Sequence, residues 1–408
     1  MKKNLLIAQS GGPTAAINAT VAGAVAQALL SEEVGVVYGA VNGIKGVMEE
    51  QIIDLGAQLA SPQALRLFSV TPAAGLGSCR LKLKDLEKDR EQFERILQVF
   101  EKYDVGYFIY VGGNDSMDTV AKLSRFVAGH GLEIKIMGAP KTVDNDLCGT
   151  DHTPGFGSAA KYVASTFAEL ARDVSVYNIK AVTIVEVMGR DAGWLTASAA
   201  AARQNGETKP QLIYLPEVPF SDERFIEDVK TCLEKEDAVL VAVSEGVRYD
   251  DGRYVSESTS NGAVDVFGHK YLAGAAKALE QMVKTHIGCK TRSVELNLMQ
   301  RCAGHLLSAV DIEESKQLGA KAVCEALAGA TGKMAAVRRL PGNGYRVEYA
   351  TVEIDQVANL ISSVPHEMIN SQGNDVSPAF LDYILPLIQG EVPVEYENGI
   401  PKHFVLKK

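Results

Sequence analysis

Short runs of hydrophobic residues alternate with segments of helical periodicity along most of the chain. Five such runs predict β-strands, and all but the run at 134–138 lack the polar alternation of a half-exposed strand, so the other four are expected to be buried on both faces. These runs are residues 5–8, 105–111, 134–138, 181–187 and 238–243. Strands alternating with helices are typical of an α/β fold in which helices flank mostly parallel sheets.

The remainder of the chain is less regular. A polar, glycine-containing stretch at 249–268 predicts an excursion between lobes or a flexible loop. Residues 270–285 and 303–328 predict two long helices, and 334–354 predicts two strands around the turn at 341–344. The first predicted strand ends at a glycine pair, after which Pro13 can open a helix.

Polar and glycine-rich loops follow the carboxyl ends of the predicted strands, where ligands bind in open α/β sheets. The loops are 10–13 (SGGP), 112–116 (GGNDS), 140–146 (PKTVDND), 188–190 (MGR) and 245–246 (EG). Glycine pairs let backbone N–H groups approach an anion. Each loop alone also fits a structural explanation, namely a tight turn, a helix cap or a polar turn.

The loop at 140–146 carries the most specific chemistry. Asp144 and Asp146 alternate, so in an extended chain they share one face and their titrations are coupled. Two carboxylates beside Lys141 suit a base that removes a hydroxyl proton while the cation holds a phosphate.

The composition of the chain excludes some classes of binding partner. The chain has 408 residues, 41 Lys and Arg against 51 Asp and Glu, and a formal net charge of −10. This acidity argues against nucleic acid or an anionic membrane surface as a partner, but it allows phosphorylated substrates that need only a few local cations. No apolar run reaches the ~18 residues of a membrane span, and no signal peptide is recognisable. Six dispersed cysteines favour free thiols and a cytoplasmic location.

Taken in order, the loops resemble the phosphofructokinase family, in particular its pyrophosphate-dependent branch. The resemblance covers about residues 5–328, and the two motifs PKTVDND and EVMGR are its most specific part. It implies two similar lobes with the active site in the cleft between them. It also implies Mg²⁺-dependent, reversible phosphoryl transfer from pyrophosphate to the 1-hydroxyl of fructose 6-phosphate, giving fructose 1,6-bisphosphate and phosphate.

The resemblance assigns roles position by position. Asp144 corresponds to the base, with Lys141, Asp115 and Arg190 as further catalytic groups. The implied donor-binding residues are Gly11, Gly12, Arg80, Gly113, Asp115 and Lys141. The implied sugar-phosphate-binding residues are Thr142, Asp144, Asp146, Met188, Gly189, Arg190, Glu245, Arg292 and Arg301. The implied metal ligands are Asn114 and Asp146. Arg292 is expected to reach the 6-phosphate of a neighbouring subunit, which implies a homodimer or homotetramer.

Asp115 and Lys141 indicate the donor. Members that use ATP have glycine at the first of these positions and commonly at the second. A carboxylate at Asp115 fills the space of a nucleotide α-phosphate and repels it, and Lys141 adds a cation where the leaving phosphate develops charge.

Two alternatives stay open from the sequence. One is an ATP-dependent 6-phosphofructokinase. The other is a catalytically weak family member that acts as a regulatory or binding subunit, suggested by departures from the family pattern at Asn114, Leu298 and Ala181.

The resemblance also predicts how the chain is divided. Residues 1–140 with about 255–300 are expected to form the donor lobe. Residues 141–254 with about 301–360 are expected to form the sugar-phosphate lobe, and 361–408 a C-terminal extension.

Overall fold

The computed structural model describes residues 2–203, 206–258 and 274–408, which form two α/β lobes. The large lobe is built on a seven-stranded sheet with the order β11-β10-β5-β4-β1-β2-β3. Its strands are β1 (Lys3–Gln9), β2 (Val34–Ala40), β3 (Ile52–Asp54), β4 (Val105–Gly112), β5 (Lys135–Pro140), β10 (Lys333–Arg339) and β11 (Val347–Glu353). The central pairs are parallel, and only the outer pairs β2–β3 and β10–β11 are antiparallel.

Helices cover both faces of this sheet. They are α1 (Ile17–Leu29), α2 (Gly43–Met48), α3 (Leu55–Gln58), α4 (Pro62–Ser69), α5 (Arg90–Lys102), α6 (Asn114–Gly129) and α11 (Ala309–Leu327). The residues of β1 alternate between two cores: Leu5 and Ile7 pack with α1 and α11, whereas Leu6 packs with α5 and α6. This explains why the strand is hydrophobic at each position from 5 to 8.

The small lobe contains a four-stranded, entirely parallel sheet with the order β7-β8-β6-β9. Its strands are β6 (Ala181–Val187), β7 (Leu212–Tyr214), β8 (Ala238–Ser244) and β9 (Lys290–Glu295). Its helices are α7 (Phe156–Val174), α8 (Trp194–Ala197), α9 (Asp222–Lys235) and α10 (Ala275–His286). Short 3₁₀ turns occur at Ser198–Ala202, Val255–Ser258, Asn297–Arg301, Ile354–Gln356, His366–Met368 and Leu385–Ile388.

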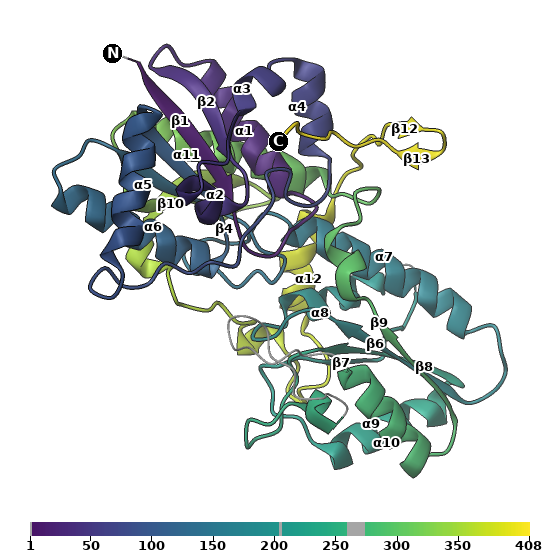
Figure 1. Ribbon diagram of the computed structural model, residues 1–408. Coiled ribbons are helices and arrows are strands. Elements are labelled where there is room, and N and C mark those ends of the chain that lie inside the picture. Colours follow the sequence, from purple (N-terminus) through teal and green to yellow (C-terminus); the bar gives the residue numbers. More distant parts are fainter. Residues whose placement is uncertain (1, 204–205, 259–273) are drawn as a thin grey trace.

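The C-terminal part of the chain returns between the lobes. After β11 it runs toward the small lobe, and α12 (Pro378–Ile384) then lies between the two (Figure 1). A short hairpin of β12 (Tyr396–Glu397) and β13 (Ile400–Pro401) follows, and the last residues return to the large lobe, where Leu406 joins its core.

The α/β architecture and all five predicted strands are confirmed, but the predicted division of the chain is wrong in two places. Residues 274–300 belong to the small lobe, because β9 pairs with β6 and α10 packs beside them. Residues 309–353 belong to the large lobe, because α11 packs against α1 and β10 pairs with β5. The predicted excursion at 249–268 lies partly outside the described residues.

Pro13 does not open a helix. The chain between β1 and α1 is a loop, and α1 begins at Ile17 without a side-chain cap. The two strands expected near 334–354 are present as β10 and β11, which pair antiparallel. All six cysteines are free, as expected. Among the described residues, no helix is long and apolar enough to cross a membrane.

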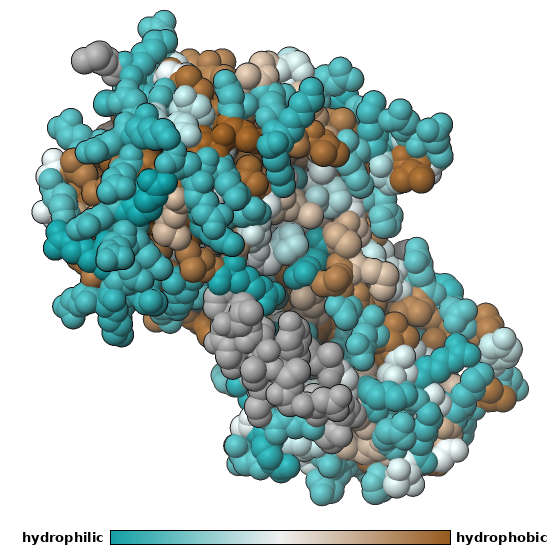
Figure 2. Space-filling view, in the orientation of Figure 1, coloured by the Kyte–Doolittle hydropathy of each residue, from teal (hydrophilic) through white to brown (hydrophobic). Residues whose placement is uncertain are grey.

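Hydrophilic residues predominate on the face of the large lobe seen in Figure 2, with hydrophobic residues in small scattered groups between them. Other polar and charged side chains line a cavity between the two lobes.

Candidate active site

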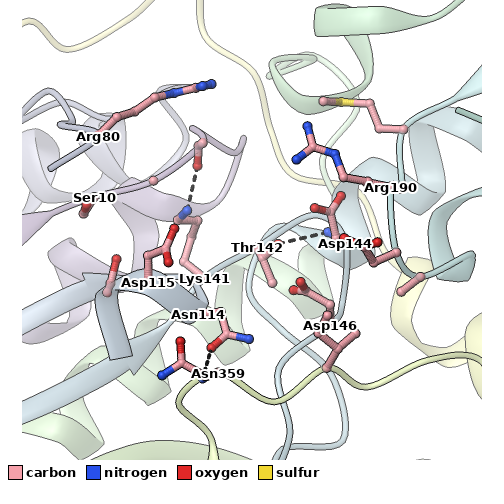
Figure 3. Close-up of a pocket in the computed structure, with 18 of the residues that line it drawn as sticks. Ser10, Arg80, Asn114, Asp115, Lys141, Thr142, Asp144, Asp146, Arg190 and Asn359 are labelled. Carbon is pink, nitrogen blue, oxygen red and sulfur yellow. Dashed lines mark hydrogen bonds between the residues drawn. The ribbon is translucent and has the colours of Figure 1, made fainter. Parts of the chain in front are cut away.

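A cavity of about 520 Å³ opens between the lobes, at the carboxyl ends of β1, β4 and β5 on one side and of β6 and β8 on the other. This is the edge where α/β sheets bind their ligands. It is lined by Ser10, Gly11, Gly12, Cys79, Arg80, Leu81, Gly113, Asn114, Asp115, Ser116, Lys141, Thr142, Asp144, Asp146, Met188, Arg190, Asp191, Ala192, Glu245, Asn359 and Ile361. In Figure 3, Arg80, Asp115 and Lys141 lie on one side of the cavity, and Asp144 and Arg190 on the other.

Lys141 lies on the large-lobe side, directly after β5. Its side chain is 2% exposed, and its Nζ donates a hydrogen bond of 2.7 Å to the carbonyl oxygen of Gly12. Gly11 has a φ of +78°, and a Cβ there would lie 3.0 Å from the same Nζ. The glycine is therefore required both by its backbone and by the close approach of the lysine. Burial lowers the pKa of Lys141 to about 8, although Asp144 and Asp146 oppose this shift.

Asp144 and Asp146 both face the cavity, as the alternation predicted. The reason differs from the prediction, because Asn145 between them has a left-handed φ of 55° and the loop is not extended. Burial raises the pKa of Asp144 above its usual range, against the attraction of Lys141 and Arg190. Burial together with the Asp144 carboxylate raises the pKa of Asp146 to about 7. A carboxylate whose pKa lies near neutrality is suited to accept a proton.

The small-lobe wall is built by the ends of β6 and β8. The N–H of Gly189 donates to the Glu245 carboxylate over 3.2 Å, and Ser244 Oγ donates to the Gly189 carbonyl over 2.5 Å. Gly189 has a φ of +132°, a conformation that favours glycine. Burial, with repulsion from Asp144, raises the pKa of Glu245 to about 8. Arg190 has a buried Nε without a hydrogen-bond partner in the described part of the chain, so it is available to an anion.

The loop after β4 was predicted to bind phosphate and metal or to cap a helix. Gly113 is the N-cap of α6, and no side chain caps this helix, so the capping explanation is wrong. Asp115 pairs with Lys82 at 3.1 Å. Asn114 instead holds the C-terminal segment: its Nδ2 donates to the carbonyl of Leu360, and its Oδ1 accepts the N–H of Asn359, both over 2.5 Å.

These contacts bear on the predicted magnesium site. Within the described residues no group of three or more His, Cys, Asp or Glu side chains could hold a metal ion alone. Mg²⁺ usually needs only one or two carboxylates when phosphates supply the other ligands, and both Asp115 and Asp146 line the cavity. Asn114 lines the cavity and also contacts residues 359 and 360, and its role as a metal ligand stays a prediction.

Most of the predicted residues line the cavity, and three lie elsewhere. Gly189 lies between two lining residues and shapes the wall through its backbone. Arg301 borders the cavity, since its Nη1 would lie 3.4 Å from a Cβ at Gly12. Arg292 does not line the cavity; it is exposed on β9, at the edge of the small sheet.

Several lining residues were not predicted. Ser10, Ser116 and Asp191 belong to motifs that the sequence shows, so their neighbours could have indicated them. Asn359 and Ile361 belong to no motif, and nothing in the sequence indicates that they return to this cavity.

Comparison with known proteins shows which family has this fold and these motifs. The family model described as Phosphofructokinase matches residues 4–326. The pyrophosphate--fructose 6-phosphate 1-phosphotransferase of Xanthomonas campestris pv. campestris (strain B100) is 40% identical over 407 residues, covering 99% of this chain and 96% of the relative. The enzyme of the same name from Halomonas elongata is 38% identical over 408 residues, with coverages of 99% and 96%.

Solved structures agree with this result. The crystal structure of a pyrophosphate-dependent phosphofructokinase from Nitrosospira multiformis matches with a TM-score of 0.87 and 35% identity, covering 99% of this chain and 96% of that one. The corresponding structure from Marinobacter aquaeolei has the same TM-score with 36% identity, covering 100% and 98%. The chain belongs to the phosphofructokinase family.

Proposed function

We propose that the protein transfers a phosphoryl group from pyrophosphate to the 1-hydroxyl of fructose 6-phosphate, giving fructose 1,6-bisphosphate and phosphate. The observation that carries the proposal is the pair Lys141 and Asp144, which lie three residues apart in one loop and face one cavity from opposite sides. Relatives that cover almost the whole chain and carry this activity in their names support it. The reaction runs in both directions, because pyrophosphate and the sugar phosphoester do not differ greatly in transfer potential.

The choice of pyrophosphate depends on the large-lobe wall. Asp115 places a negative charge at the start of α6, where a nucleotide would need room for its α-phosphate. Lys141 and Arg80 supply positive charge on the same wall, and Lys141 is desolvated, so its charge acts strongly on a bound phosphate. A compact donor with only two phosphates suits this wall.

Asp144 acts as the base on the sugar side. Its carboxylate takes the proton of the 1-hydroxyl as that oxygen attacks the phosphorus, and Arg190 stabilises the charge on the phosphoryl group in transit. Glu245 accepts hydrogen bonds from sugar hydroxyls, and Arg301 attracts the 6-phosphate. Asp146 and Asp115 would hold Mg²⁺, which neutralises charge on the phosphates when it is bound.

We propose a cytoplasmic homodimer or homotetramer. Arg292 lies outside the cavity of its own chain, so a role in binding the 6-phosphate requires a second subunit. The edge of the small sheet is suited to such contact, because Arg292 and Lys290 lie beside Tyr177 and Ile179, which are 62% and 48% exposed.

Formation of fructose 1,6-bisphosphate from fructose 6-phosphate and Mg²⁺, measured with equal concentrations of pyrophosphate or ATP, tests the proposal. We expect turnover with pyrophosphate at least 100-fold above that with ATP. Asp144→Asn should lower kcat by about 10³-fold with little change in the affinity for the sugar, whereas the exposed control Asp250→Asn should not. Equal turnover with ATP would refute the donor assignment, and full activity of Asp144→Asn would refute the base.

A further inference from the structure

The conformation of Asn145 sets the directions of the two catalytic-loop carboxylates, because it lies between Asp144 and Asp146. A left-handed φ of 55° is unfavourable for a non-glycine residue, although asparagine tolerates it better than most. Asn145 is also 3% exposed, so its amide must find partners inside the protein. Both requirements mean that this conformation is held by its surroundings.

Two partners hold the Asn145 side chain. Its Oδ1 accepts the backbone N–H of Thr153 over 2.9 Å. Its Nδ2 donates to the hydroxyl of Tyr383 over 2.8 Å. Thr153 Oγ1 also donates to the carbonyl of Thr142 over 2.8 Å, so the loop is closed on itself at one end. Tyr383 is the contact that comes from outside the loop, 238 residues further along the chain.

Tyr383 is itself firmly placed. It belongs to α12 and is 8% exposed, and its hydroxyl donates to the carbonyl of Asp151 over 2.8 Å. One face of its ring is 4.7 Å from the Arg339 guanidinium, and its centroid is 5.0 Å from that of Trp194. The hydroxyl therefore accepts from Asn145 and donates to Asp151, with its ring fixed by a cation–π contact and an aromatic contact.

A second contact from the C-terminal part of the chain holds Asp146, the other carboxylate residue of the loop. The N–H of Ser362 donates to the carbonyl of Asp146 over 2.8 Å. The carbonyl of Ser362 accepts from Trp194 Nε1 over 3.0 Å, which ties this contact to the residue that packs on Tyr383. The loop that carries both carboxylates is thus supported from behind by residues 362 and 383.

We propose that Tyr383 is a positioning residue for phosphoryl transfer, which acts through Asn145 to orient Asp144 and Asp146. Tyr383 does not line the cavity, so it acts through Asn145 and not by contact with a substrate. This inference rests on the phosphotransferase activity proposed above. It gives the C-terminal segment a catalytic purpose, although this segment lies beyond the residues that match the family model.

The first test compares Tyr383→Phe with Tyr214→Phe. The control removes a buried hydroxyl of the same kind, since Tyr214 is 7% exposed and donates to Asp228 over 2.7 Å, but it lies in the core of the small lobe away from the loop. We expect Tyr383→Phe to lower kcat at least tenfold and to leave KM for both substrates within about twofold. Tyr214→Phe should leave kcat unchanged. Equal kcat values for the two variants would overturn the proposal.

A double-mutant cycle with Asn145→Gly tests the route of the effect. Glycine keeps the left-handed backbone but removes the amide that Tyr383 holds. We expect Tyr383→Phe to lower kcat by less than threefold in the Asn145→Gly background. An undiminished tenfold loss there would show that Tyr383 does not act through Asn145.

Hydrogen exchange separates this inference from the proposed function. The N–H of Thr153 is protected by Asn145, so Tyr383→Phe should speed exchange of this amide at least tenfold whether or not the enzyme is active. Wild-type protein without pyrophosphate-dependent turnover would refute the proposed function, and the exchange of Thr153 would still decide whether Tyr383 holds the loop. Unchanged exchange would overturn the inference.

Discussion

Replacing Asp146 with asparagine should stabilise the protein at alkaline pH while reducing its activity. Burial and the neighbouring Asp144 raise the pKa of Asp146 from 3.8 to about 7. The folded protein therefore binds this proton more tightly than the unfolded chain does. Below pH 4 the group is protonated in both states and costs nothing. As the pH rises from about 4 to about 7, the wild type loses stability because the unfolded chain releases the proton first.

The structure gives the size of this effect. A carboxyl whose pKa changes from 3.8 to about 7 carries about 4 kcal/mol of unfavourable free energy once it is ionised. Asp146 is only half-buried, so screening by solvent reduces the expected gain of Asp146→Asn at pH 8 to about 2–4 kcal/mol. For a chain of 408 residues this corresponds to a rise in Tm of about 2–5 °C.

Differential scanning calorimetry at pH 4.5 and pH 8 checks the prediction, with Asp250→Asn as the exposed control. Asp146→Asn should raise Tm at pH 8 and change it by less than about 1 °C at pH 4.5, while kcat with pyrophosphate falls. A variant that is destabilised at pH 8 would refute the reasoning, because the ionised carboxylate would then be favourably placed. An equal gain at both pH values would show that packing, and not charge, is responsible.

Two further substitutions test the large-lobe wall. Asp115→Gly removes the carboxylate that opposes a nucleotide α-phosphate. ATP should therefore become a weak donor, while turnover with pyrophosphate falls about tenfold, both measured as kcat/KM. Continued exclusion of ATP would contradict the role of this charge. Lys141→Met removes a buried ammonium whose pKa is lowered to about 8, so Tm at pH 7 should not fall despite the lost hydrogen bond to Gly12, and kcat should drop about 10²–10³-fold. Retained turnover would show that Lys141 does not stabilise the leaving phosphate.

Buried parallel strands are the part of this fold that a single sequence predicts well. Five strands are predominantly hydrophobic runs, and the structure contains each of them within two residues. The remaining strands lack that pattern for physical reasons. β2 contains Gly35 and Gly39, β7 has only three residues, and β9 (KTRSVE) is a polar edge strand. Their pairing depends on neighbours that the periodicity of one segment does not contain.

The division into lobes could not be predicted from local patterns. The chain crosses between the lobes several times, and each crossing is decided by pairing with distant strands, such as β10 with β5. The predicted site succeeded where a motif follows a strand, since the carboxyl ends of parallel strands meet at one edge. It failed for Asn359, which lines the cavity, and for Tyr383, which contacts the loop behind it; both make contacts more than 200 residues apart in sequence.

Burial shifts the pKa values of three ionisable groups in the cavity, Lys141, Asp146 and Glu245. Burial lowers the pKa of Lys141 to about 8 and raises those of Asp146 and Glu245 to about 7 and about 8, so in each case the charged form is the disfavoured one. A fold selected only for stability would replace these groups with neutral ones. Their retention between the lobes is explained if a bound phosphate and its metal ion supply the compensating charges. The buried charges that destabilise the free protein then contribute favourable interactions with the bound substrate. An acidic protein can in this way bind an anion without a basic surface.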